Sequence, residues 1–251
     1  MDDAQLLRYS RHILLDELGP DAQQKFASAH ALVVGMGGLG TPAAQFLAAA
    51  GVGTITICDA DHVDLTNLQR QVLYATADIG ARKVDAAAQR LAAINPEVRV
   101  VRVPERVGPE ALAPLVTAAD IVLDGCDNFA TRHAVNRACV AAGKPLVSGA
   151  AIRFDGQVAV FDTRDAASPC YHCLFGEGEE LEETRCATMG VFAPLTGIVG
   201  ATQAAEALKL IAGVGESLAG RLLLLDALAM RWREMRVPRD PACPVCGHRS
   251  A

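Results

Sequence analysis

The chain has 251 residues, of which 51% are hydrophobic and 21% are charged, and a formal net charge of −6 at pH 7. This composition is typical of a soluble globular protein with a sizeable core. The acidic balance argues against nucleic acid as the main partner, because that role requires clustered cations. The most apolar stretch, residues 195–208, contains Glu206 and is too short to span a membrane. The N-terminus begins Met-Asp-Asp without an apolar signal core, so we expect a cytoplasmic protein.

The first segment, residues 6–18, is predicted to form a helix or a pair of helices ahead of the first strand. Arg8 and Arg11 lie one helical turn apart, and a solvated surface pair is their ordinary interpretation. The apolar residues expected to form the opposite side are Leu6, Leu7, Ile13, Leu14 and Leu18.

A strand, a glycine-rich turn and a helix follow in the pattern of a nucleotide-binding unit. Residues 31–34 read as a buried strand, and the sequence G-x-G-G-x-G at 35–40 allows backbone N–H groups to approach a phosphate. The helix over 39–50 leads to a second strand at 54–58. Asp59 then stands where a Rossmann unit places the carboxylate that binds a ribose hydroxyl. These residues predict an adenine nucleotide without deciding between NAD and ATP.

A long polar run, residues 60–71, follows Asp59 at the carboxyl end of a parallel strand, which is where ligands bind in open α/β sheets. Its Arg70 could also be a solvated surface residue. The next helix is predicted over residues 80–94, with Arg82 and Lys83 in its first turn. Cations are unfavourable at a helix N-terminus by about 0.3–1 kcal/mol, so this pair suggests an anion nearby.

The next buried strand, residues 121–124, runs into Gly125-Cys126-Asp127-Asn128 and then a helix that ends before Gly143. Asp127 or Asn128 could be the N-cap of that helix. A carboxylate at the end of a central strand is equally well placed to hold a magnesium ion, and both interpretations stay open here.

The second half of the chain has a different pattern. Residues 145–149 and 156–161 are predicted to pair through a turn at Asp155-Gly156. A mostly apolar helix is predicted over 194–212, followed by a hairpin around Asp226-Ala227. The parallel pattern of the first half therefore gives way to antiparallel strands.

Four of the eight cysteines form two C-x-x-C pairs, Cys170/Cys173 and Cys243/Cys246. Disulfides are not expected in a cytoplasmic chain, whereas two such pairs supply four thiolates for a tetrahedral zinc ion. The rival is a redox pair, but neither C-x-x-C stands at a strand-to-helix junction. Zinc bound here would clamp the C-terminal tail to the body. The thiols predicted to be small core residues are Cys58, Cys126 and Cys139.

The charged residues at the predicted strand ends help to choose the nucleotide. Arg11, Arg70, Lys83 and Asp127 offer several cations and one magnesium-binding carboxylate. This set suits a triphosphate better than a dinucleotide, whose two phosphates are bound largely by backbone groups. The residues therefore favour ATP over NAD.

These motifs resemble those of the MoeB/ThiF adenylyltransferases, which are relatives of the ubiquitin-activating enzymes, over almost the whole chain. The length and the zinc pairs are especially similar to those of molybdopterin-synthase adenylyltransferases. The matching motifs are R-Y-x-R at 8–11, G-x-G-G-x-G at 35–40, Asp59, residues 66–71, Gly80-x-x-Lys83, Asp124-x-x-Asp127-Asn128, Ser148-Gly149-Ala150, residues 190–194 and both C-x-x-C pairs.

We therefore expect an α/β fold with a Rossmann-like doubly wound sheet, parallel in its N-terminal half and continuing into antiparallel strands, and a zinc-clamped C-terminal tail. The resemblance implies a single adenylyltransferase domain over residues 1–251. Within it we expect a helical arm at 1–30, a nucleotide-binding half at 31–150 and a carrier-binding and zinc half at 151–251.

The resemblance implies ATP-dependent adenylation of the C-terminal glycine of a ubiquitin-like sulfur-carrier protein that ends in Gly-Gly. The products are an acyl-adenylate, which later becomes a thiocarboxylate with sulfur from a separate donor protein, and pyrophosphate. Asp59 is expected to bind the ribose, Asp127 magnesium, and Arg11 the γ-phosphate in the neighbouring subunit of a homodimer. The other residues expected at the nucleotide are Gly38, Gly40, Thr66, Asn67, Leu68, Gln69, Arg70, Lys83 and Asn128.

Cys186 matches a cysteine that some relatives use for covalent sulfur or thioester chemistry, and a loop thiol without function is the alternative. Two other functions are weighed against the adenylyltransferase. One is an NAD-dependent Rossmann oxidoreductase, against which Arg70, Lys83 and the zinc pairs count. The other is a non-catalytic scaffold that binds carrier or nucleotide without turnover.

Overall fold

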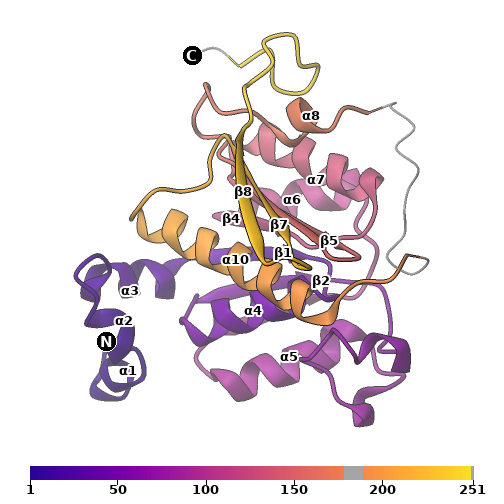
Figure 1. The fold of residues 1–251 in the computed structure, drawn as a ribbon. Helices are drawn as coiled ribbons and strands as arrows, with labels where there is room; N and C mark the ends of the chain where they lie inside the picture. The colour runs from indigo at the N-terminus through magenta and orange to yellow at the C-terminus, as the bar shows by residue number, and fades with distance from the viewer. Residues whose placement is uncertain (178–188, 250–251) are drawn as a thin grey trace.

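The computed structural model describes residues 1–177 and 189–249, whose strands form one mixed sheet of eight (Figure 1). The strand order is β3-β2-β1-β4-β5-β6-β7-β8. Strands β3, β2, β1, β4 and β5 run parallel to one another, and β6, β7 and β8 pair in antiparallel fashion. The strands are β1 (His30–Val34), β2 (Thr54–Cys58), β3 (Arg99–Val103), β4 (Ile121–Asp124), β5 (Leu146–Ile152), β6 (Asp155–Phe161), β7 (Arg221–Asp226) and β8 (Arg231–Arg236).

The helices cover both faces of this sheet, as expected for a doubly wound fold. One core cluster joins the sheet to α4, α5 and α10, and a second joins the opposite face to α6 and α7 (Figure 1). The helices are α1 (Asp3–Arg8), α2 (Ser10–Ile13), α3 (Gly19–Ser28), α4 (Gly40–Ala49), α5 (Lys83–Ile94), α6 (Pro109–Ala118), α7 (Phe129–Ala142), α8 (Tyr171–Leu174) and α10 (Ala193–Ala212), with 3-10 turns η1 (Leu65–Asn67) and η2 (Thr76–Asp78).

The arrangement of the central strands confirms the predicted fold class. Strand β1 pairs with β2 on one side and β4 on the other, with Leu32 opposite both Thr56 and Val122. The chain therefore winds outward in both directions from β1, and the carboxyl ends of β1 and β4 meet at the point where the direction reverses. That point is where ligands bind in open α/β sheets.

The N-terminal helices differ from the expected packing. The predicted helix pair forms over Asp3–Arg8 and Ser10–Ile13 rather than over 6–18, and most of the predicted apolar side is not buried in this chain, since Leu7 is 77% and Leu14 is 70% exposed. The pair is held instead through Tyr9, whose hydroxyl donates to Glu97 Oε2 (3.1 Å) and accepts from Asn95 Nδ2 (2.8 Å). Gly51 permits this contact, because a Cβ there would lie 2.6 Å from the Tyr9 ring.

Two element boundaries also differ. The turn between β5 and β6 lies at Arg153 and Phe154 rather than at Asp155-Gly156, because Asp155 already pairs with Ile152 and Arg153 takes the positive φ of 51°. Helix α5 begins at Lys83, because the preceding residues form an irregular loop in which Gly80 has a φ of 87°. Within the described residues, no helix combines the length and apolar character needed to cross a membrane.

Candidate active site and metal centre

A cavity of about 960 Å³ opens at the carboxyl ends of the parallel strands. The glycine turn after β1, the polar run after β2 and the loop after β4 all contribute to it. The predicted site residues in its wall are Gly38, Asp59, Asn67, Arg70, Lys83, Asp127 and Asn128. Of the described residues expected at the nucleotide, those outside the wall are Gly40, Thr66, Leu68 and Gln69.

The glycine turn is tight because its first and last glycines, Gly35 and Gly40, lie against each other. The Gly35 N–H donates to the Cys58 carbonyl (2.8 Å), and the Gly35 φ of 91° is one that residues with a Cβ rarely adopt. A Cβ at Gly40 would lie 1.8 Å from the Gly35 carbonyl oxygen, so Gly40 acts through packing. Tyr74 holds the turn from outside by donating its hydroxyl to the Met36 carbonyl (2.9 Å).

Asp59 is fixed by backbone donors on either side. Its carboxylate accepts from the N–H of Met36 and from the N–H of Asp61, both at 2.8 Å. Lys83 approaches the same group from α5, with Nζ 3.8 Å from Asp59 Oδ2 and 2.9 Å from Asp61 Oδ2. The Lys83 side chain is only 6% exposed, so a buried cation stands beside the predicted ribose carboxylate.

The polar run folds around η1, and only some of its side chains turn toward the cavity. Arg70 donates from Nη1 to the Thr66 carbonyl (3.0 Å), which directs its guanidinium along the cavity wall. Thr66 is instead occupied with Asp64, to which both its N–H and its hydroxyl donate. Leu68 packs against the apolar core, and Gln69 is exposed.

The structure separates the two interpretations of the loop after β4. Asn128 is the N-cap of α7, because its side-chain oxygen accepts from the Thr131 N–H (2.9 Å). Asp127 is therefore not needed as a cap. Its carboxylate lies in the cavity wall and accepts a long hydrogen bond of 3.4 Å from the Asn128 amide.

The sequence reasoning missed Arg132, a buried cation in the cavity wall. Its Nη2 donates to the carbonyls of Cys126 (2.6 Å) and Gly149 (2.9 Å), and Nη1 lies 3.6 Å from the buried Asp124 carboxylate. Burial alone would disfavour the charge, but the Asp124 carboxylate together with the neighbouring Cys126 and Tyr171 raises the pKa of Arg132. The signal in the sequence was an arginine one turn into the helix that follows Asp127.

Two predicted catalytic residues are not brought to this cavity within the described chain. Arg11 lies on α2, is exposed, and is absent from the cavity wall. Cys186 lies outside the described residues. Of the three predicted core thiols, Cys58 and Cys139 are buried, whereas Cys126 is only partly buried; Cys58 and Cys126 both line the cavity. Burial raises the pKa of Cys58 to about 12, so this thiol stays protonated at neutral pH.

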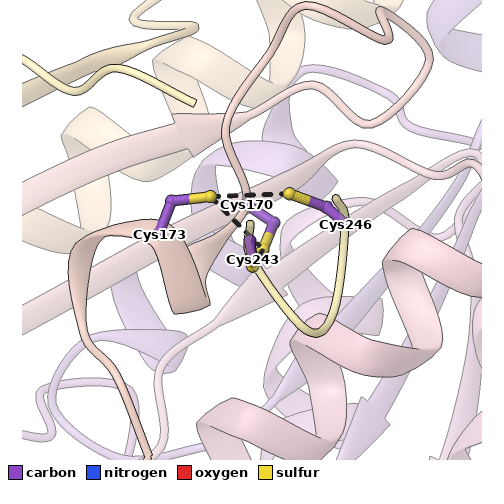
Figure 2. A group of neighbouring side chains, drawn as sticks. All are labelled: Cys170, Cys173, Cys243 and Cys246. Atoms are coloured by element: carbon purple, nitrogen blue, oxygen red, sulfur yellow. Dashed lines mark hydrogen bonds between the residues drawn. The ribbon is translucent and has the colours of Figure 1, made fainter. Parts of the chain in front are cut away.

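The four paired cysteines converge on one point, as Figure 2 shows. Their sulfur atoms all lie within 4.8 Å of one another, with separations of 4.0 Å for Cys170–Cys173, 3.8 Å for Cys170–Cys243 and 3.4 Å for Cys173–Cys246. A tetrahedron with metal–sulfur bonds of about 2.3 Å has edges of about 3.8 Å. The cluster therefore has the dimensions of a four-thiolate metal site.

Two arginines hold the second cysteine pair: Arg239 braces the tail internally, and Arg249 ties the tail to the body of the protein. Arg239 donates from Nη2 to the carbonyls of Cys246 (2.9 Å), Gly247 (3.1 Å) and Arg249 (2.9 Å). Arg249 in turn donates to the carbonyls of Thr163 (2.9 Å) and Ser168 (2.5 Å), which precede the first pair. These contacts hold both cysteine pairs in place from outside the cluster.

Comparison with known proteins agrees with this arrangement. The family model described as "ThiF family" matches residues 9–245. The chain is 45% identical to the sulfur carrier protein ThiS adenylyltransferase of Escherichia coli, over 100% of this chain and 99% of that protein. It is 44% identical to the molybdopterin-synthase adenylyltransferase of the same species, over 98% of each. A crystal structure of Escherichia coli MccB with ATP has a TM-score of 0.84 at 26% identity, over 96% of this chain and 73% of that one. The chain therefore belongs to the ThiF family, as its sequence motifs predict.

Proposed function

We propose that this protein uses ATP to adenylate the C-terminal glycine of a ubiquitin-like sulfur-carrier protein. The observation that supports this most directly is the presence of Arg70, Lys83 and Asp127 in the wall of one cavity beside the glycine turn. Cations and a free carboxylate in one cavity suit a triphosphate, and the curated relatives are named adenylyltransferases of sulfur carriers. In this proposal residues 31–150 bind the nucleotide and residues 151–251 bind the carrier.

The proposed reaction needs no general base. A C-terminal carboxyl group has a pKa of about 3.3–3.7 and is already ionised at neutral pH. One carboxylate oxygen attacks the α-phosphorus, a new phosphorus–oxygen bond forms, and the bond to the β-phosphate breaks to release pyrophosphate. The barrier comes from joining two anions. Arg70, Lys83 and the backbone N–H groups of the glycine turn would lower it by offsetting the charge that develops.

Asp127 would hold a magnesium ion in this proposal. The two cavity carboxylates of the loop after β2 have stronger partners, since Asp59 accepts from two backbone N–H groups and Asp61 from Lys83. Within the described residues, the Asp127 carboxylate has the long contact with the Asn128 amide, which fits a carboxylate that is available to a cation. When bound, magnesium would neutralise phosphate charge.

The four-cysteine site would hold zinc in a structural role. Four thiolates close the coordination sphere and leave no open position for a substrate, which is typical of structural zinc. Such an ion would join the C-terminal loop to α8, as expected from the cysteine spacing.

A homodimer would account for the exposed leucines of the N-terminal arm. Leu7 and Leu14 are far more exposed than leucines in the body of the sheet, and both flank Arg11 in the sequence. Burying them against a second copy would also offer Arg11 a route into the partner's cavity.

The first test is ATP–pyrophosphate exchange with magnesium against a panel of purified sulfur carriers that end in Gly-Gly. We expect exchange with one carrier and none when its last glycine is removed. A separate sulfur-donor protein should not be needed for this half-reaction. Absence of exchange with every carrier, together with tight NAD binding, would instead favour the oxidoreductase, and nucleotide binding without turnover would favour the scaffold.

Single substitutions test the roles of the cavity residues. Lys83→Ala and Asp127→Ala should each slow exchange by about 10²–10³-fold, because the first removes a cation that offsets phosphate charge and the second removes the proposed magnesium ligand. Zinc content and the thermal unfolding midpoint should stay close to those of the parent protein. Arg82→Ala is the matched control, since Arg82 is adjacent but exposed and outside the cavity wall. Full activity in Lys83→Ala would contradict the assignment.

The dimer proposal has its own test. Arg11→Ala should abolish exchange, whereas mixed dimers of Arg11→Ala with Asp127→Ala should recover activity at one site per dimer. If verified mixed dimers stay inactive, Arg11 does not act across the interface.

A further inference from the structure

The four-cysteine site and the cavity meet at two consecutive residues. Cys170 belongs to the cysteine cluster, and the next residue, Tyr171, is fully buried in the cavity wall. Tyr171 packs edge-to-face on Phe161 and His133 and lies against Phe175. A shift of the chain at Cys170 would therefore move a large side chain in the wall of the cavity.

Asn136 on α7 contacts both of these residues. Its side-chain oxygen accepts from the Tyr171 N–H (2.9 Å), and its Nδ2 donates to the Cys170 sulfur (3.6 Å). The Asn136 side chain is completely buried, so neither half of its amide can turn to water instead. One side chain thus fixes a metal-site sulfur and the backbone of a cavity residue together.

The same helix face continues to the cavity floor. Arg132 stands one turn before Asn136 on α7 and donates to the carbonyls of Cys126 and Gly149, both at or beside the cavity wall. Burial raises the pKa of Tyr171, and the positive charge of Arg132 acts in the opposite direction. Asn136, Tyr171, Arg132 and the loop at Cys126 are therefore in continuous contact.

We infer that Asn136 is a positioning residue that couples occupancy of the four-cysteine site to the geometry of the cavity wall at Tyr171 and Cys126. A metal-bound Cys170 sulfur is held in one position, which orients the Asn136 amide and presents its oxygen to Tyr171. An unbound cysteine can rotate among its side-chain rotamers, and the amide then loses its fixed orientation. By linkage, if the bound metal raises the affinity of the cavity for a ligand, that ligand must raise the affinity of the cysteine site for the metal by the same factor.

This inference rests on metal occupancy of the cluster and not on the adenylation reaction, so it can be tested without a carrier. Amide hydrogen exchange is compared between zinc-loaded protein and protein treated with a chelator. Chelation should speed exchange at residues 125–132 and 170–174 as well as at residues 240–249. Residues 54–58 of β2 serve as the internal reference. Loosening confined to 170–174 and 240–249 would overturn the proposal.

Two substitutions separate the hydrogen bonds of Asn136. Asn136→Asp keeps an acceptor for the Tyr171 N–H but loses the donor to Cys170, and Asn136→Leu removes both. In each variant, exchange at 125–132 should no longer respond to chelation. Asn136→Leu should already exchange fast at 170–174 when zinc-loaded. Cys139→Ala is the matched control, because it alters another buried side chain on α7 and should keep the parent response.

The coupling between the cysteine site and the cavity can also be measured as a change in binding affinity. The zinc affinity of the parent protein, measured by competition with a chromophoric chelator, should rise by about fivefold or more when a non-hydrolysable ATP analogue is present. The affinity for the analogue should rise by the same factor when zinc is present. Asn136→Asp should lower both factors to near one. If the analogue binds but the factor is already one in the parent protein, the coupling is absent, whereas failure of the analogue to bind would count against the proposed function.

Discussion

Residues 31–150 and residues 151–249 complete the same sheet but are held by different interactions. In the first part, the central strands β1, β2 and β4 are almost wholly buried between helices. Their ends are joined by backbone hydrogen bonds, Gly35 N–H to Cys58 and Gly125 N–H to Val34. The cavity thus stands on a part of the fold whose stability is spread over many apolar contacts.

Strand β6 and helix α10 of the second part share the same apolar core, but its C-terminal end depends on a few groups. Strand β8 is exposed along its whole length, and the chain beyond it has no regular secondary structure in the described residues up to 249. That tail is held to the body by the cysteine cluster and by the carbonyl contacts of Arg249, and Arg239 braces it internally. One chain thus builds the glycine-turn side of its cavity on a distributed core and holds its tail by a small number of contacts.

Loss of a cysteine ligand should have the largest effect and should separate the two parts. Cys243→Ser should remove zinc, which contributes about 10–16 kcal/mol of binding free energy in small zinc peptides at pH 7. We expect early proteolysis after residue 237 and a lower thermal midpoint, while the parallel strands stay folded. Zinc analysis, limited proteolysis and calorimetry measure this. Cys139→Ala should keep its zinc, and an unchanged midpoint in Cys243→Ser would show that the tail is held without metal.

Arg132 tests the parallel part. Arg132→Leu leaves the Asp124 carboxylate buried without its cation, so the free energy of unfolding should fall by about 3–5 kcal/mol in urea titrations. The control is Arg137→Leu, because the Arg137 pair with Glu177 is exposed and should contribute at most about 1 kcal/mol. Equal losses in the two variants would mean that burial does not distinguish these ion pairs.

Substitution of His133 should have the smallest effect on stability. His133 lies on α7 in the first part and contacts Tyr171 and His172 of the second part. Burial lowers the pKa of His133 below its usual value, although the nearby Glu177 acts in the opposite direction. The unfolded chain therefore takes up a proton first as the pH falls below about 6.5, and stability should decrease from pH 7 towards pH 5.5. His133→Gln should flatten this slope, measured by urea unfolding at each pH. The exposed His62→Gln should leave it unchanged.

The local patterns of the sequence predicted much of the fold and of the site. The glycine turn, Asp59 and the paired cysteines each depend on short spacings, and the structure places them as those spacings require. The choice between Asp127 and Asn128 as N-cap stayed open because it depends on the exact start of α7. In the structure Asn128 is the N-cap.

What the sequence did not predict depends on contacts between distant segments. The importance of Arg132 comes from Asp124 and Gly149, which lie on two other strands. The leucines of the N-terminal arm show a helical period, but a period cannot say whether the chain itself or another molecule covers them. Tyr171 was likewise inconspicuous, since its place in the cavity wall follows from the folding of the cysteine cluster.

The two outermost strands have a consequence for solubility. An unpaired strand edge is a template for edge-to-edge aggregation, and charged side chains are one of the means that prevent it. Here β8 at one end of the sheet bears Arg231, Arg233 and Arg236, and β3 at the other end bears Arg99 and Arg102. Mutual repulsion between these cations would keep the open edges of neighbouring molecules apart at high protein concentration.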